Sequence, residues 1–317
     1  MRITRDDIDR AAGRVAGHVR QTPVLDLAPG TFGLPARILL KLESLQHAGS
    51  FKARGAFNAL LSAAESGGVP QAGVIAASGG NHGAAVAYAA RSLGHRAEIF
   101  VPRVASPAKL QRLRDFGAEV RVVGAAYAEA LAACQARQQE TGALSVHAYD
   151  EPAVLAGQGT LARDLQEQVP DLDAVLVAVG GGGLIGGIAA WYHGAPGKVL
   201  TKVIGVEPSA CPTLHAALAA GAPVDVEVGG IAADSLGARR IGALTFANRQ
   251  VIDQALLVED DAIRETRRLL WRELRLAVEP GGATALAALI SGRYPCVAGN
   301  KIGVVICGGN TDPGDLA

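Results

Sequence analysis

Short apolar segments with the length of strands alternate along this chain with longer segments in which apolar residues recur at helical spacing. Segments 74–77, 174–179 and 301–306 are almost continuously apolar, which is typical of strands buried on both faces of a parallel sheet. Helical segments such as 152–168 and 260–276 separate such strands, so helices should cover both faces. The sequence therefore predicts an α/β fold. The expected strands are 38–42, 74–77, 97–101, 119–123, 174–179, 202–207 and 301–306.

The composition excludes several classes of protein. Basic and acidic residues balance at 30 each and aromatic residues make up 4% of the chain, so a nucleic-acid partner is not expected. No apolar run is long enough to cross a bilayer, and no apolar stretch of a secretory signal follows Met1. The four cysteines form no Cys-x-x-Cys pair, which argues against a disulfide framework or a zinc site. We therefore expect a protein of the reducing cytoplasm without a membrane partner.

Glycine-rich turns connect several of the expected strands and helices, and α/β proteins bind their ligands at such turns. The first of these turns carries Lys52 between Gly49 and Gly55. The backbone freedom of these glycines could let the lysine amine approach an aldehyde cofactor and form a Schiff base with it. A solvated lysine at the start of a helix is the alternative, and this segment alone does not decide between the two.

The second turn, from Ser78 to Gly83, leads from a strand into a helix. The N–H groups at a helix N-terminus attract anions, and Ser78, Asn81 and His82 add polar side chains at the same place. A substrate carboxylate is the anion that we expect here. The same residue types also cap ordinary helices, so that alternative stays open.

The third turn contains four consecutive glycines, Gly180 to Gly183, after the expected strand 174–179. Four glycines in a row carry a high cost in conformational entropy, so a purely structural explanation is weak. Their backbone can wrap closely around a phosphate, and anion binding is therefore favoured.

The third turn also allows a different interpretation. Gly181, Gly183 and Gly186 have the spacing of the dinucleotide-binding fingerprint, and Glu207 follows about 20 residues later, at the end of the next strand. A nicotinamide-dependent dehydrogenase is therefore an alternative. It leaves the lysine turn around Lys52 without a role.

Taken in order, these turns and three further motifs resemble the fold-type II enzymes that use pyridoxal 5′-phosphate (PLP), in the branch of the threonine and serine dehydratases and serine racemases. The resemblance covers nearly the whole chain. Its motifs are Ser50-Phe51-Lys52-Ala53-Arg54-Gly55-Ala56, Ser78 to Gly83, Ala156-Gly157-Gln158-Gly159-Thr160, Gly180 to Leu184, Glu279-Pro280 and Cys307-Gly308-Gly309-Asn310.

The resemblance implies two open parallel-sheet α/β domains with PLP in the cleft between them. The large domain would comprise residues 1–49 and 148–317, and the small domain residues 50–147. A homodimer is implied as well.

The resemblance also implies roles for the residues of these motifs. Lys52 would hold PLP as a Schiff base and move the α-proton of the substrate, and Cys307 would face the pyridine nitrogen. The third turn, Gly180 to Gly183 (the glycine turn), would bind the phosphate. The substrate carboxylate would contact Ser78, Asn81 and His82. The complete set of expected cofactor residues is Phe51, Lys52, Asn81, Gly180, Gly181, Gly182, Gly183, Leu184, Glu279 and Cys307.

The reaction implied is the elimination of water from a small hydroxy-amino acid such as serine or threonine, which gives a 2-oxo acid and ammonia. A thiol at Cys307 is a poor proton source for the pyridine nitrogen, and a weaker electron sink suits elimination better than transamination. Racemases resemble a Ser-Ser-Gly-Asn-His loop, and Gly79 replaces their second serine, so racemisation is disfavoured. Members with a metal site resemble a Glu-Pro pair followed by an acidic ligand. In the segment from Glu207 to Thr213 no acidic residue follows Glu207, so no metal ligand set is expected, although a metal or monovalent-cation site near Glu207 stays open.

Three alternatives stay open. The first is another reaction of the same cofactor, such as racemisation or the dehydration of 3-hydroxyaspartate. The second is the dehydrogenase, and the third is a non-catalytic amino-acid-binding module. Substrate choice depends on loops such as 148–150 and 230–237, which the sequence alone does not place.

Overall fold

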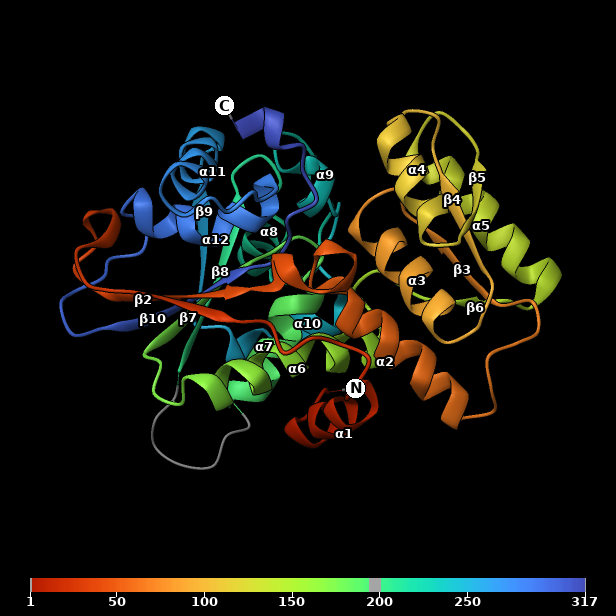
Figure 1. The fold of residues 1–317 in the computed structure, drawn as a ribbon, viewed down its shortest axis with the longest axis horizontal. Helices are drawn as coiled ribbons and strands as arrows, with labels where there is room; N and C mark the ends of the chain where they lie inside the picture. The colour runs from red at the N-terminus through yellow and green to blue at the C-terminus, as the bar shows by residue number, and fades with distance from the viewer. Residues whose placement is uncertain (1, 194–200, 317) are drawn as a thin grey trace.

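The computed structural model describes residues 2–193 and 201–316. In this part of the chain two separate sheets form, one of six strands and one of four, and helices cover them (Figure 1). The large sheet contributes to one apolar cluster, and the small sheet contributes to two others. The α/β fold with parallel sheets is therefore confirmed. No helix in the described ranges is long and apolar enough to span a bilayer.

The large sheet has the strand order β1-β2-β10-β7-β8-β9. Strand β10 near the end of the chain lies between β2 and β7, so N-terminal and C-terminal segments are neighbours in one sheet. All its pairings are parallel except that of β1 with β2. The strands are β1 (Val24–Leu27), β2 (Arg37–Leu42), β7 (Ala174–Ala178), β8 (Lys202–Pro208), β9 (Gln254–Val258) and β10 (Lys301–Ile306).

The small sheet has the order β5-β4-β3-β6, and its strands are all parallel. It consists of β3 (Val74–Ala77), β4 (Ala97–Val101), β5 (Glu119–Val122) and β6 (Leu144–Ser145). Its helices, at the right of Figure 1, are α2 (Lys52–Glu65), α3 (Asn81–Ser92), α4 (Pro107–Asp115) and α5 (Tyr127–Thr141). The exact boundaries of the two domains stay a prediction.

The remaining helices accompany the large sheet. They are α1 (Arg5–Val15), α6 (Pro152–Gln168), α7 (Gly183–His193), α8 (Thr213–Ala220), α9 (Ala233–Leu236), α10 (Ala243–Ala247), α11 (Asp260–Leu274) and α12 (Pro280–Ile290).

Glycines let the helices α2, α6 and α7 approach closely. A Cβ atom on Gly157 of α6 would lie 2.7 Å from the backbone oxygen of Arg54 and from the Cα atom of Gly55, both in α2. A Cβ atom on Gly187 of α7 would lie 2.6 Å from the backbone nitrogen of Gly159 in α6. These separations exclude any side chain, so the motif around Gly157 and Gly159 serves helix packing.

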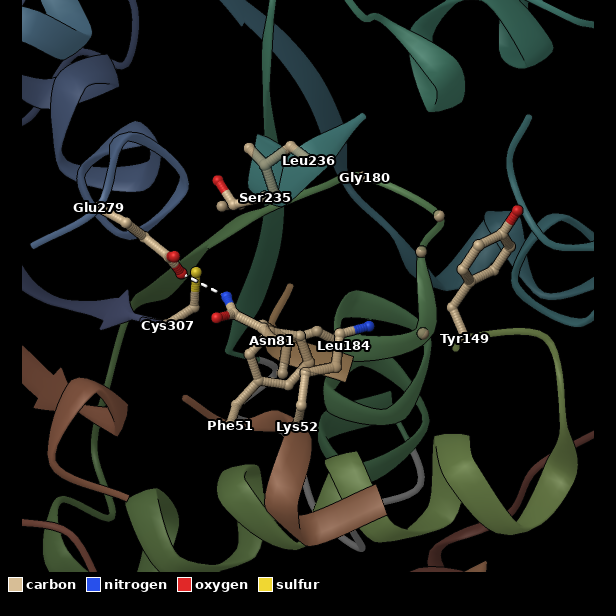
Figure 2. A pocket seen from close by; sticks show the side chains of 14 residues that line it. Phe51, Lys52, Asn81, Tyr149, Gly180, Leu184, Ser235, Leu236, Glu279 and Cys307 are labelled. Atoms are coloured by element: carbon tan, nitrogen blue, oxygen red, sulfur yellow. Dashed lines mark hydrogen bonds between the residues drawn. The ribbon is translucent and has the colours of Figure 1, made fainter. Parts of the chain in front are cut away.

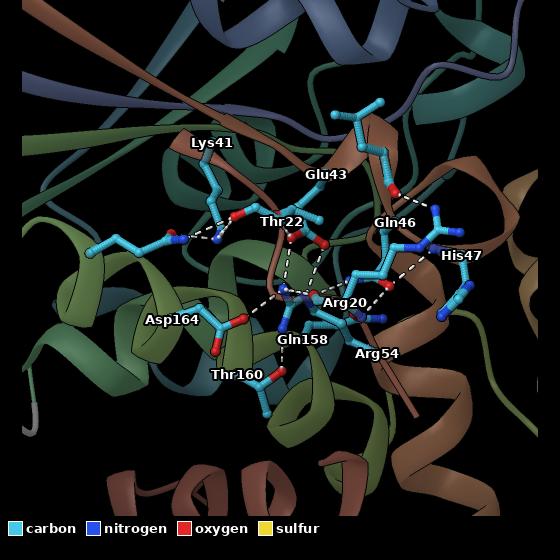
Figure 3. Close-up of polar contacts among 12 residues, drawn as sticks. Arg20, Thr22, Lys41, Glu43, Gln46, His47, Arg54, Gln158, Thr160 and Asp164 are labelled. Atoms are coloured by element: carbon cyan, nitrogen blue, oxygen red, sulfur yellow. Dashed lines mark hydrogen bonds and ion pairs between the residues drawn. The ribbon is translucent and has the colours of Figure 1, made fainter. Parts of the chain in front are cut away.

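A buried charge network fixes the beginning of α2. The guanidinium of Arg54 makes two hydrogen bonds of 2.8 Å to the carboxylate of Glu43, which follows β2. Asp164 of α6 accepts a further contact at 2.8 Å, and Thr160 of the same helix one at 3.1 Å (Figure 3). Nearby, Lys41 donates to Thr22 and to Gln168. Because this network ties β2 and α6 to the first turn of α2, it holds the turn that begins with Lys52.

Candidate active site

A cavity lies where the turns around Lys52, Asn81 and Gly180 meet, at the carboxyl ends of strands from both sheets. The segments following β3, β7 and β10 contribute to it, as does the start of α2 (Figure 2). Its lining residues are Phe51, Lys52, Asn81, Tyr149, Ala178, Gly180, Gly181, Gly182, Gly183, Leu184, Ser235, Leu236, Glu279 and Cys307.

Lys52 is the first residue of α2, and its amine donates a hydrogen bond of 2.7 Å to the carbonyl oxygen of Ala148. The surrounding protein desolvates the amine and lowers its pKa to about 8, against the opposing influence of Cys307 and Glu279. A lysine with such a pKa is partly neutral near pH 7. It can therefore act as a nucleophile and as a base.

The glycine turn presents free N–H groups. The carbonyl oxygens of Gly180, Gly181 and Gly182 accept from Thr213, from the backbone of Gly242 and from Thr245, respectively. In contrast, no described residue accepts a hydrogen bond from the N–H groups of these three glycines. The first N–H groups of α7, on Gly183 and Leu184, also have no partner within the helix. Five unsatisfied donors at one cavity are suited to a phosphate.

The surroundings of this turn leave no room for side chains. A Cβ atom on Gly180 would lie 2.9 Å from the backbone oxygen of Leu236, and one on Gly183 would lie 2.9 Å from the backbone of Tyr149. Gly182 adopts φ +91°, which favours glycine on its own. At Gly180, Gly182 and Gly183 the backbone conformation or the neighbouring backbone therefore requires glycine.

Cys307 directly follows β10 at the opposite side of the cavity, where its thiol donates to the carbonyl oxygen of Gly281 at 3.3 Å. Burial raises the pKa of this thiol far above its usual range, so the sulfur carries its proton. The backbone N–H of Phe51 donates to the carbonyl oxygen of Cys307 at 3.1 Å. This bond fixes the lysine turn relative to Cys307.

Asn81 connects the two sheets. Its amide nitrogen donates to Glu279 at 2.6 Å, and its amide oxygen accepts from Asn310 at 2.6 Å. Burial raises the pKa of Glu279 to about 7, while the hydrogen bond from Asn81 opposes this rise. The orientation of the Asn81 amide is thus set from the large sheet, although the residue begins α3 of the small one.

Ser78 and His82, predicted to act together with Asn81, do not line this cavity. The imidazole of His82 lies 2.9 Å from the carbonyl oxygen of Val146, and burial lowers its pKa to about 3. The hydroxyl of Ser78 accepts from the backbone of Gly80 at 3.3 Å. Their predicted contact with a substrate carboxylate stays a prediction.

Several lining residues were not predicted individually. Tyr149, Ser235 and Leu236 belong to the loops 148–150 and 230–237, and Ser235 accepts a hydrogen bond of 3.1 Å from the backbone of Gly281. No residue pattern marks these loops, because their position depends on contacts with distant segments.

Thr213 was missed entirely. Its hydroxyl lies 2.5 Å from the carbonyl oxygen of Gly180 and 3.0 Å from the carboxyl group of Glu207. Glu207 also accepts from the backbone of Leu214 and His215, and burial raises its pKa to about 7. The Thr213 hydroxyl has one proton, so at any moment it donates a hydrogen bond either to the Gly180 carbonyl oxygen or to the Glu207 carboxyl group. Glu207 therefore accepts hydrogen bonds from the start of α8. Because Thr213 at this position also contacts the carbonyl oxygen of Gly180, the start of α8 helps hold the glycine turn.

Comparisons with known proteins agree with this geometry. The model of the family described as "Pyridoxal-phosphate dependent enzyme" matches residues 15–308. An L-threonine ammonia-lyase of Geobacter sulfurreducens is 38% identical over 306 residues, which are 96% of this chain and 75% of that protein. A phenylserine dehydratase of Ralstonia pickettii is also 38% identical, over 99% of this chain and 96% of that protein.

Among solved structures, maize serine racemase superimposes with a TM-score of 0.92 at 33% identity, over 100% of this chain and 96% of that one. A serine racemase of Dictyostelium discoideum gives a TM-score of 0.89 at 32% identity, over 98% and 99%. The predicted family is thereby confirmed, and the chain belongs to the pyridoxal-phosphate dependent enzymes, in the branch of the threonine ammonia-lyases and serine racemases.

Proposed function

We propose that this protein is a lyase that removes water from a small hydroxy-amino acid, in the manner of a threonine or serine dehydratase, and releases a 2-oxo acid and ammonia. The observation that carries this proposal is the cavity lined by the amine of Lys52, the protonated thiol of Cys307 and the free N–H groups of the glycine turn. Proteins named threonine ammonia-lyase or phenylserine dehydratase among the relatives support the same reaction class.

The residues of the cavity fit PLP. The five free N–H groups of the glycine turn would hold its phosphate, Lys52 would bind its aldehyde, and Cys307 would face its pyridine nitrogen. Phe51 and Glu279 would border the ring. When bound, PLP withdraws electrons from the Cα atom of the substrate and so makes the α-proton acidic.

Lys52 is the base that we propose for the α-proton. Its desolvated amine has a pKa of about 8, which matches proton transfer near neutral pH. The carbonyl oxygen of Ala148 at 2.7 Å orients the amine. Asn81, whose amide is fixed by Glu279 and Asn310, would contact the substrate carboxylate together with Ser78 and His82.

Two residues favour elimination over racemisation. The buried thiol of Cys307 would not readily give its proton to the pyridine nitrogen of PLP, so the bound cofactor would be a weak electron sink, which suits elimination better than a reversible proton exchange at Cα. Gly79 has no side chain that could return a proton from the other face. Serine racemases are nevertheless among the relatives, at 32% identity, so racemisation is the second candidate.

A nicotinamide-dependent dehydrogenase and a non-catalytic binding module have less support. The family assignment argues against the dehydrogenase, and Glu207 is engaged with α8. A non-catalytic binding module would not need a lysine whose pKa is lowered to about 8. A cytoplasmic location is proposed from the scattered cysteines and the lack of an apolar signal stretch after Met1, and a homodimer from the resemblance.

The test is an incubation with L-serine and L-threonine, in which 2-oxo acid and amino-acid chirality are both followed. We expect 2-oxo acid from at least one substrate, with loss of activity and of visible absorbance in Lys52→Ala. The exposed Lys202→Ala is the matched control and should behave like the wild type. Inverted amino acid without 2-oxo acid would instead establish a racemase. Retained turnover in Lys52→Ala would refute the assignment of the base.

A further inference from the structure

A second cavity adjoins the first, and Asn81 and Glu279 line both. It lies between the small sheet's helices α3 and α4 and the large sheet's segments around α9 and α12. Its lining residues are Gly79, Gly80, Asn81, Ala84, Lys109, Arg112, Leu113, Asp234, Glu279 and Asn310. A substrate that reaches past Asn81 would therefore enter it.

The charges in this cavity are unevenly paired. Lys109 of α4 forms an ion pair with Asp234 of α9, so these two charges offset one another. Arg112, one helical turn further along α4, is half-buried. Within residues 2–193 and 201–316, its guanidinium has neither an ion pair nor a hydrogen bond to a protein group.

Burial makes this lone guanidinium costly. Desolvation lowers the pKa of Arg112, whereas the Glu279 carboxyl acts in the opposite direction. Even so, arginine stays protonated in proteins. Glu279 is a weak partner because burial raises its own pKa to about 7, so it carries only part of its charge near neutral pH. A half-buried cation without a full counter-charge is a strong site for a planar anion.

The adjoining backbone favours an anion as well. Gly79 and Gly80 precede the N-terminus of α3, whose helix dipole is positive at this end. The cavity is also lined by Ala84 and Leu113, which exclude water from part of its wall. A carboxylate bound in this cavity would lose hydrogen bonds to water and accept hydrogen bonds from the Arg112 guanidinium in their place.

We propose that Arg112 determines substrate specificity by binding a second carboxylate, so that the preferred substrates are hydroxy-amino acids with an acidic side chain, such as 3-hydroxyaspartate. This inference rests on the proposed function and names its substrate class. The substrate loses its Cα proton and its β-hydroxyl as water. The released enamine tautomerises to an imine, and water then hydrolyses it to a 2-oxo dicarboxylic acid and ammonia.

The experiment compares kcat/KM for L-serine, L-threonine and both diastereomers of 3-hydroxyaspartate in the wild type, Arg112→Met, Arg112→Lys and Arg114→Met. Arg114 lies on the same helix, is exposed and lines neither cavity, so it is the matched control. We expect Arg112→Met to lower the ratio of kcat/KM for 3-hydroxyaspartate to that for serine by about 10- to 100-fold, as expected for a lost charge-assisted hydrogen bond. Arg112→Lys should retain part of the preference.

A binding measurement complements the kinetics. Calorimetric titration of the holoenzyme with succinate, a dicarboxylate that cannot react, should give weaker binding in Arg112→Met and unchanged binding in Arg114→Met. Unchanged succinate affinity in Arg112→Met would overturn the inference.

The two proposals fail in different ways. Wild-type enzyme that converts serine or threonine but neither diastereomer of 3-hydroxyaspartate would overturn the role of Arg112 and keep the lyase. An equal loss of kcat/KM with all substrates in Arg112→Met would also overturn the role of Arg112 in specificity and keep the lyase. Arg112 would then serve the α-carboxylate that all these substrates share. Absence of 2-oxo acid from every substrate would refute the lyase itself.

Discussion

Replacing Arg54 by methionine tests whether the buried charge network stabilises the fold. The side chains of Arg54 and Glu43 are 1% and 0% exposed, and their two hydrogen bonds measure 2.8 Å each. Methionine has a similar length and no charge, so Arg54→Met leaves the Glu43 carboxylate buried without its main partner. Asp164 is 15% exposed and can recover some hydration.

The size of the effect follows from this burial. Removing one partner of a buried ion pair costs about 3–5 kcal/mol, because the remaining charge is left without compensation. The free energy of unfolding of Arg54→Met should therefore fall by about this amount, which is about two to four powers of ten in the unfolding equilibrium. Arg163→Met is the control. Arg163 lies on the same helix as Asp164 but is 36% exposed, and its surface pairs contribute about 0–1 kcal/mol.

Urea unfolding followed by circular dichroism measures both variants. The double variant Glu43→Gln with Arg54→Met should be more stable than Arg54→Met alone, since a neutral amide costs less to bury than a carboxylate. A loss below about 1 kcal/mol in Arg54→Met, equal to that of Arg163→Met, would refute the reasoning.

The pH dependence gives a second check. Burial alone would raise the pKa of Glu43, but the charge and hydrogen bonds of Arg54 outweigh it, and the pKa lies below the usual value. A depressed carboxyl pKa stabilises the fold above the pKa of the unfolded chain, about 4.3. This stabilisation is lost as the pH falls through the folded pKa, so the wild type should lose stability in acid.

Four further predictions concern the site. Gly183→Ala should raise the dissociation constant for PLP at least about tenfold through a lost phosphate contact, whereas Gly13→Ala, whose Cβ would meet no atom within 4 Å, should not. Thr213→Val should destabilise the holoenzyme by about 1–3 kcal/mol in urea, because the Gly180 carbonyl loses its donor, and Thr213→Ser should restore it. Gly79→Ser should add racemase activity, measured as D-serine, since a Cβ there meets nothing closer than 3.5 Å. The rate at which the apoprotein binds PLP should rise with pH as the Lys52 amine loses its proton and level off above about pH 8; a continued rise towards 10.5 would contradict its lowered pKa.

The sequence alone predicted the central strands of both sheets, because strands buried on both faces are almost continuously apolar. It missed β1 and β9 at the edges of the large sheet and β6 at one edge of the small sheet, all of which have partly exposed side chains. It also missed α5, in which only Ala130 and Cys134 are buried, so no apolar stripe marks the helix.

The turns around Lys52, Asn81 and Gly180 were likewise visible in the sequence. Each joins a strand to a helix and combines glycines with polar residues, a local pattern that needs no knowledge of distant contacts. The resemblance to PLP enzymes followed from their order along the chain, and the comparisons confirmed it.

The tertiary structure decided which of these residues meet. It brought Asn81 into the cavity, with its amide fixed by Glu279 and Asn310, and placed one ring nitrogen of His82 at the carbonyl oxygen of Val146. It placed Tyr149, from an unmarked loop, against the glycine turn. Local sequence sets the conformation of a turn, whereas side-chain direction and pKa depend on burial and on partners that lie far away along the chain, and only the packed chain brings these together.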